Sequence, residues 1–163
     1  MSMKTAAWIS AIVPAAAFAE GLVGSTIPPY PTGLVHTQGA CIARALQGAA
    51  DECDFSIGIL EHSSGLPQTL FGARIAGHDD AGRARWTITD ALPYPALPEG
   101  YLLAIATCES DGRRDETIVA AVRAAETEWL ADVIWARRYA VGTQKFVEQP
   151  GRGVRCLNEG WGL

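Results

Sequence analysis

Four cysteines are the side chains of this 163-residue chain whose chemistry is most informative: Cys41, Cys53, Cys108 and Cys156. An even number of cysteines in an exported chain is typical of a disulfide framework, and here it predicts two disulfides. Zinc binding is the alternative, but the chain has no CxxC or CxxxH spacing that would place ligands around the ion. We therefore predict structural disulfides and no metal or other cofactor.

The helical spacing of apolar side chains in residues 40–51 predicts a helix there. A helix rises about 1.5 Å per residue, so Cys41 and Cys53 would lie on the order of 18 Å apart, too far for a disulfide. A strand expected at residues 54–60 would begin beside the end of an antiparallel strand expected at residues 101–108. Two pairings remain, and the one that we favour joins Cys53 to Cys108 and Cys41 to Cys156, because it fits these elements.

The three histidines, His36, His62 and His78, do not belong to a recognisable nucleophilic triad. Two serines follow His62, but the chain has no G-x-S-x-G stretch of the kind that exposes a catalytic serine. The sequence His78-Asp79-Asp80 could hold a divalent cation, although aspartates close to a glycine are also typical of a turn. We assign no catalytic residue and no metal ligand.

Acidic side chains near the predicted strand ends are the remaining candidates for acid–base chemistry. They are Glu61, Glu109, Asp111, Asp115 and Glu116. Glycoside hydrolysis requires two carboxyl groups that face one another across a cleft. Nothing in the spacing selects such a pair, so no catalytic pair is predicted.

Residues 127–140 contain the aromatic and basic side chains that often dominate protein interfaces. As a strand, residues 131–140 place Trp135, Arg137 and Tyr139 on one face, whereas a helix would carry an apolar stripe instead. We favour the strand, which makes these three residues a candidate interaction stripe. In the alternative interpretation the tryptophan belongs to the core and the arginine pairs with an acid at the sheet edge.

Residues 1–19 have the features of a secretory signal peptide. Lys4 precedes a short apolar segment, and Ala17-Phe18-Ala19 forms a small-x-small cleavage pattern. The apolar segment is shorter than the roughly 20 residues of a membrane-spanning helix, and a proline interrupts it. We predict cleavage near Ala19, a mature chain of residues 20–163 without a membrane span, and a location in the periplasm or outside the cell.

The charge of the chain limits its partners. It carries 13 basic and 18 acidic residues, a formal net charge of −5. This excess of acid argues against nucleic acid as a partner, because phosphates require a basic surface. Nearly all the basic residues are arginine, which together with the signal peptide suggests a bacterial source.

Strand-like segments separated by turns dominate residues 54–158. Residues 20–39, rich in proline and glycine, are predicted to form an irregular arm, and residues 91–100 to cross between strands. The expected fold is α+β, with the helix of residues 40–51 packed on a curved, mainly antiparallel sheet of about 6–7 strands in a single domain. An all-β sandwich or a partly open barrel is the alternative.

The lack of a catalytic constellation and the rigid framework favour an exported, non-enzymatic domain that binds another envelope or extracellular protein, for example as an inhibitor of a hydrolase. One alternative is a small exported hydrolase that uses dispersed acids such as Glu109 or Asp111 with a histidine. Another is a structural or assembly component of the envelope. A pocket with converging acids would favour the hydrolase, whereas a sheet edge open to a partner strand would favour the envelope component.

Overall fold

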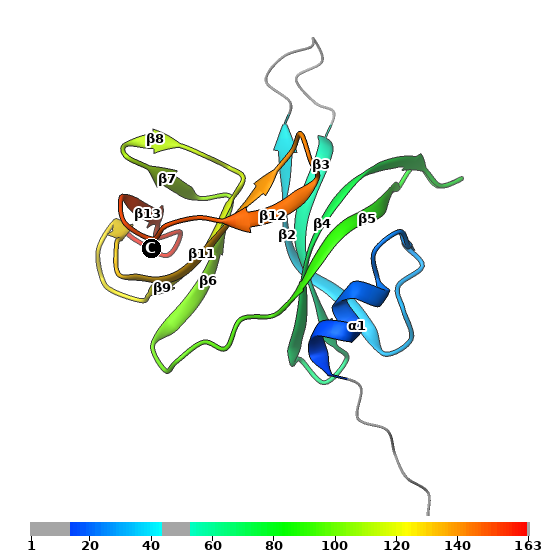
Figure 1. The fold of residues 1–163 in the computed structure, drawn as a ribbon, viewed down its shortest axis with the longest axis horizontal. Helices are drawn as coiled ribbons and strands as arrows, with labels where there is room; N and C mark the ends of the chain where they lie inside the picture. The colour runs from blue at the N-terminus through cyan, green and yellow to red at the C-terminus, as the bar shows by residue number, and fades with distance from the viewer. Residues whose placement is uncertain (1–13, 44–52, 163) are drawn as a thin grey trace, which may run out of the picture.

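The computed structural model describes residues 14–43 and 53–162. Over these ranges the chain forms a short helix and antiparallel strands that make three separate sheets (Figure 1). The predicted antiparallel strands and the presence of two disulfides are confirmed, but the prediction of one sheet with six or seven strands is wrong. A hydrophobic cluster lies at each interface between these layers.

The first sheet has five strands in the order β1-β5-β4-β3-β2. They are β1 (Thr26–Ile27), β2 (Leu34–Ala43), β3 (Cys53–His62), β4 (Pro67–His78) and β5 (Ala84–Pro93). The pairing of β4 with β5 confirms the predicted hairpin. β3 is buried on both faces, since Ile57 and Ile59 pack toward the second sheet and Leu60 packs on the opposite side.

The second sheet has the order β12-β11-β9-β6, with β6 (Tyr101–Ile105), β9 (Ile118–Arg123), β11 (Val133–Ala140) and β12 (Lys145–Glu148). The third has the order β10-β13-β7-β8, with β7 (Cys108–Ser110), β8 (Arg113–Arg114), β10 (Trp129–Leu130) and β13 (Val154–Leu157). The strand predicted at residues 101–108 is divided between these sheets. Ala106 has a φ of 59°, a left-handed conformation that interrupts extended structure.

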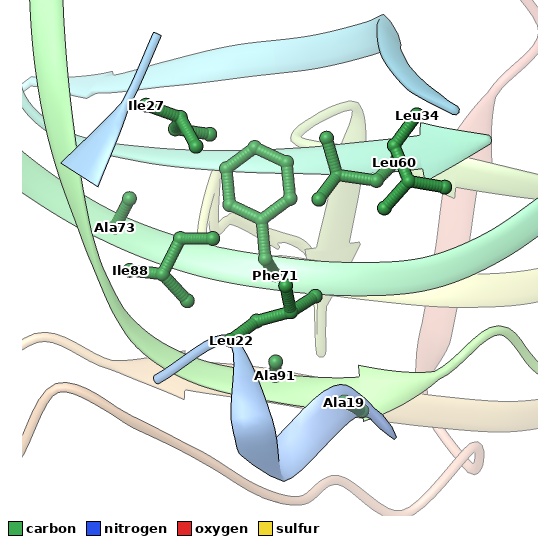
Figure 2. Packing of buried hydrophobic residues seen from close by; sticks show 9 residues of the cluster. All are labelled: Ala19, Leu22, Ile27, Leu34, Leu60, Phe71, Ala73, Ile88 and Ala91. Carbon is green, nitrogen blue, oxygen red and sulfur yellow. The ribbon is translucent and has the colours of Figure 1, made fainter. Parts of the chain in front are cut away.

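Helix α1 (Ala15–Gly21) covers the outer face of the first sheet (Figure 1). Figure 2 shows the cluster beneath it, with the Phe71 ring among aliphatic side chains from several strands. Its members are Ala19, Leu22, Ile27, Leu34, Leu60, Phe71, Ala73, Ile88 and Ala91. Cleavage near Ala19, which stays a prediction, would cut α1 and remove Ala19 from this cluster but leave Leu22.

Two further clusters join the sheets to one another. The cluster between the first and second sheets contains Ile42, Phe55, Ile57, Ile59, Leu70, Val119 and Tyr139. The cluster between the second and third contains Ala104, Cys108, Ile118, Ala120, Val122, Leu130, Ala136, Val154 and Cys156. β9 supplies alternate residues to both clusters, because successive side chains of a strand point to opposite faces. This explains why its sequence is apolar at consecutive positions.

The structure corrects the predicted helix. Residues 40–43 belong to strand β2, and the rest of the predicted helix, residues 44–51, lies outside the described residues. β2 also includes residues 34–39, so the predicted irregular arm ends in a regular strand. The apolar spacing at residues 40–43 fits a strand as well as a helix, and pairing with β3 decides between them.

The predicted disulfide pairing is also wrong. Cys41 is bonded to Cys53, with Cα atoms 5.5 Å apart, because they lie on the neighbouring antiparallel strands β2 and β3. Cys108 is bonded to Cys156, which lies directly opposite on β13. The prediction failed because it excluded the first pair on the assumption of a helix between them.

Candidate functional site

The first and second sheets are joined along one side by polar contacts. The Asp90 carboxylate accepts a hydrogen bond from the Phe146 backbone N–H at 2.7 Å and lies 3.2 Å from Lys145 Nζ. The Tyr139 hydroxyl forms a 2.6 Å hydrogen bond with the Thr89 hydroxyl. These contacts connect β5 of the first sheet to β11 and β12 of the second.

The opposite side of the same two sheets is open. β2 is the last strand of the first sheet, and β6 is the last strand of the second. A groove of about 700 Å³ lies between them, and we call it the edge groove. It is lined by residues 37–41 of β2, by Leu102, Leu103 and Ile105 of β6, and by Ala106, Thr107, Arg114, Glu116 and Glu159.

The two edges offer unpaired backbone groups to an occupant of the groove. An edge strand has N–H and C=O groups on its outer side that can pair with another chain. β2 is ten residues long, and its residues 35–39 are exposed. Proline and lysine, which often protect edges from such pairing, are both absent from residues 34–43. β2 therefore offers an edge for one additional strand, with a regular register over residues 38–42 beyond the shift at His36/Gln38.

A smaller cavity of about 210 Å³ lies next to the edge groove and shares part of its lining, and we call it the anchor cavity. Its apolar wall includes Trp129, Leu157 and Cys108, and Thr107, Arg114 and Glu159 line both the cavity and the groove. The Thr107 hydroxyl is buried at this junction and has no hydrogen-bond partner among the described residues.

The charges around the anchor cavity leave one acid free. Glu109 pairs with Arg155 at 2.6 Å, and the Arg155 guanidinium lies 4.4 Å from the centre of the Trp129 ring. Arg114 lies 3.5 Å from Glu116. Glu159 has no ion-pair partner within 4 Å in the part of the chain that the structure describes.

The predicted interaction stripe lies elsewhere. Trp135, Arg137 and Tyr139 alternate along β11, as expected for a strand, but their shared face packs toward the first sheet. Tyr139 is fully buried, so it takes no part in a surface. Trp135 is half-buried, and Arg137 lies 5.3 Å from its ring centre and 3.5 Å from Glu148. These contacts fit the interpretation of this stripe as core and sheet edge.

Three of the five acids considered for catalysis, Glu109, Asp115 and Glu116, pair with arginines. Glu109 pairs with Arg155 as described, and Asp115 lies 3.1 Å from Arg138 and accepts hydrogen bonds from Thr117. The backbone N–H of Asp111 donates to the carbonyl of Gly153. Within residues 14–43 and 53–162, no hydrogen bond or ion pair joins these acids to a histidine, so no acid–histidine pair is assembled there.

The His78-Asp79-Asp80 segment forms a turn between β4 and β5. Asp79 Oδ1 accepts hydrogen bonds from the backbone N–H groups of Ala81 and Arg83, each at 2.9 Å, and its other oxygen lies 2.8 Å from Arg83 Nε. These interactions hold the pKa of Asp79 below its usual value. No group of three His, Cys, Asp or Glu side chains suited to a metal ion occurs in the described ranges.

His36 provides a prediction about pH. Although His36 is partly exposed to solvent, its imidazole lies against the Phe71 ring and over the backbones of Gly39 and Gly58, and the water displaced by these contacts lowers its pKa below the usual 6.5, partly offset by a hydrogen bond with the Gln38 backbone. The unfolded chain therefore binds a proton at higher pH than the folded chain does, and stability should fall as the pH drops below about 6.5. Thermal melts of the wild-type chain, of His36→Gln and of the control His62→Gln, at the end of β3, would check this. A pH dependence that is unchanged in His36→Gln would contradict it.

Sequence reasoning missed the edge groove. The sequence predicts an irregular arm and a helix where the β2 wall lies, and the bend at Ala106 carries no glycine or proline that would mark it. Residues 36–41 are three polar residues followed by three small ones, so the period of two that marks a half-buried strand is absent and gives no local signal for this wall.

The fold and the groove define the described part of the chain as a disulfide-linked, multi-sheet antiparallel β protein in which the edge strands β2 and β6 line one groove. Comparison with protein-family models, with curated proteins and with solved structures finds no match to this chain. Among the described residues, no helix has the length and apolar character needed to cross a membrane.

Proposed function

We propose that this chain is an exported protein-binding domain that holds an extended segment of a partner protein in the edge groove. The observation that carries the proposal is the pair of free sheet edges, β2 and β6, on either side of one groove. Addition of a strand to a free edge is a recurrent mode of peptide recognition, in which backbone hydrogen bonds give affinity and pockets for alternate side chains give specificity.

The proposal assigns different roles to the two walls. A segment that extends the first sheet beyond β2 would direct every second side chain toward β6, where Leu102 is 39% exposed and Ile105 is half-buried. The polar rim of Arg114, Glu116 and Glu159 would stay in contact with water. Two disulfides are compatible with export, since they persist in oxidising compartments.

The test uses random displayed peptides of about ten residues, the length of β2, selected against the oxidised full-length chain. We expect enriched peptides whose affinity falls at least about tenfold in Leu102→Lys, because the charge enters an apolar wall of the site. The matched control is Val147→Lys on β12, the far edge of the second sheet. Val147 is 42% exposed, close to the value for Leu102, so the two variants should be equally stable.

Backbone pairing is tested on one selected peptide by methylating its amide nitrogens one at a time. Addition to β2 predicts that methylation at every second position abolishes binding, while the intervening positions tolerate it. Enriched peptides that bind Leu102→Lys as tightly as wild type, or that show no alternation on methylation, would contradict the proposal. Self-association of the chain that is lost in Leu102→Lys would assign the groove to a second copy and also contradict it.

A further inference from the structure

We infer that the partner segment carries a large apolar side chain that enters the anchor cavity, next to a lysine or arginine that pairs with Glu159. This inference rests on the proposed function, because it describes the occupant of the edge groove. It follows from the shape, the hydrogen bonding and the charge of the anchor cavity.

The anchor cavity is built to receive an apolar group. Its volume of about 210 Å³ leaves room for one large side chain, and its wall includes Trp129, Leu157 and the buried Cys108. Leu157 is 40% exposed, so part of its side chain is free to contact an occupant. The Trp129 ring is held in place by Arg155, which Glu109 holds in turn. A wall fixed before binding loses little entropy when an occupant enters.

The Thr107 hydroxyl marks where the occupant's backbone would pass. It lies on the lining of both the edge groove and the anchor cavity, and it is buried without a hydrogen-bond partner among the described residues. An unpaired buried hydroxyl destabilises the free protein, because it has lost its bonds to water. Rotation of the Thr107 side chain on binding would turn this hydroxyl toward the cavity, where a backbone C=O or N–H of the bound segment beside its anchor residue would restore one such bond.

The charge of the rim selects a basic neighbour for the anchor residue. Glu109 and Glu116 already have arginine partners, whereas Glu159 has none in the described part of the chain, so the rim keeps one uncompensated negative charge. The chain as a whole has a net charge of −5, which favours approach of a cationic segment.

The test continues with the peptides selected against the full-length chain. We expect a consensus of one apolar residue next to a lysine or arginine, and at least about a tenfold loss of affinity when the apolar residue becomes alanine. Glu159→Gln should weaken binding about two- to fivefold and reduce its dependence on salt, as for an exposed ion pair. The control Glu126→Gln, an exposed acid outside the groove, should leave affinity and salt dependence unchanged.

The variant Thr107→Val distinguishes a role of the Thr107 hydroxyl in binding from a role in stability. Removing the unpaired hydroxyl should raise the melting temperature of the free protein by a few degrees and weaken the peptide severalfold, two effects of opposite sign. Peptides that depend on Leu102 but show no such consensus, and that bind Glu159→Gln and Thr107→Val normally, would overturn this inference and leave the proposed function standing. Failure to find any peptide that depends on Leu102 would overturn both.

Discussion

Replacing Gly72 with alanine is expected to lower the free energy of unfolding by about 3 kcal/mol, a value at the upper end for overpacking in a core. Gly72 lies on β4 and faces the second sheet, where a Cβ atom would overlap the Tyr139 ring. Tyr139 is fully buried and its hydroxyl is bound to Thr89, so the ring cannot move aside without losing that hydrogen bond. The measurement is urea denaturation of both chains at equal protein concentration.

Two further variants make this expectation specific. Gly142→Ala is the matched control, because Gly142 lies in the β11–β12 turn, where an alanine Cβ would meet no described atom within 4 Å beyond its chain neighbours. It should change stability by less than about 1 kcal/mol. Shortening the tyrosine, as in Tyr139→Leu, should make the Gly72→Ala change less harmful, because the overlapping ring atoms are gone. Equal losses with and without the tyrosine would show that the ring contact is not the cause.

Removing the Cys108–Cys156 disulfide is the second change with a large expected effect. This disulfide joins cysteines with a sequence separation of 48. The loss of chain entropy that it imposes on the unfolded state corresponds to about 4 kcal/mol in the free energy of unfolding. For the Cys41–Cys53 disulfide, with a sequence separation of 12, the same account gives a contribution of about 3 kcal/mol to the free energy of unfolding. Cys108 and Cys156 are also fully buried between the second and third sheets, so their truncation leaves a cavity as well.

We therefore compare two double variants by urea denaturation, Cys108→Ala/Cys156→Ala and Cys41→Ala/Cys53→Ala. The variant that lacks Cys108 and Cys156 should unfold at the lower urea concentration. Alanine is chosen because serine would bury an unpaired hydroxyl.

The order in which the two disulfides are reduced gives an independent check. Cys41 is exposed on β2, so a thiol reductant should open Cys41–Cys53 first in the folded protein, as read by alkylation and mass spectrometry. Earlier labelling of Cys108 and Cys156 would contradict the burial argument.

The Cys108–Cys156 disulfide also links stability to the proposed binding site. Cys108 lines the anchor cavity and follows Thr107 directly, so this bond holds one wall of the cavity against β13. The Cys41–Cys53 bond instead lies at β2, the strand proposed to pair with the partner segment. An oxidising compartment would therefore stabilise the β2 wall of the edge groove and one wall of the anchor cavity.

Local patterns in the sequence were sufficient for most of the strands. The alternation of apolar residues in 54–60 and 131–140, and the turn residues at 78–82, predicted β3, β11 and the β4–β5 hairpin because side-chain period and turn chemistry are local properties. The even number of cysteines predicted that disulfides form. How these cysteines pair was not predictable, since it depends on which strands become neighbours.

Tertiary structure alone decided the number of sheets and the position of the candidate site. The apolar run of β9 is compatible with any strand buried on both faces, and only packing shows that it separates two cores. Residues 40–43 form part of strand β2 because their backbone pairs with β3, although the apolar spacing of these residues also suited a helix. The edge groove exists because β2 and β6 are each the last strand of a different sheet, and free backbone edges have no signature in the sequence.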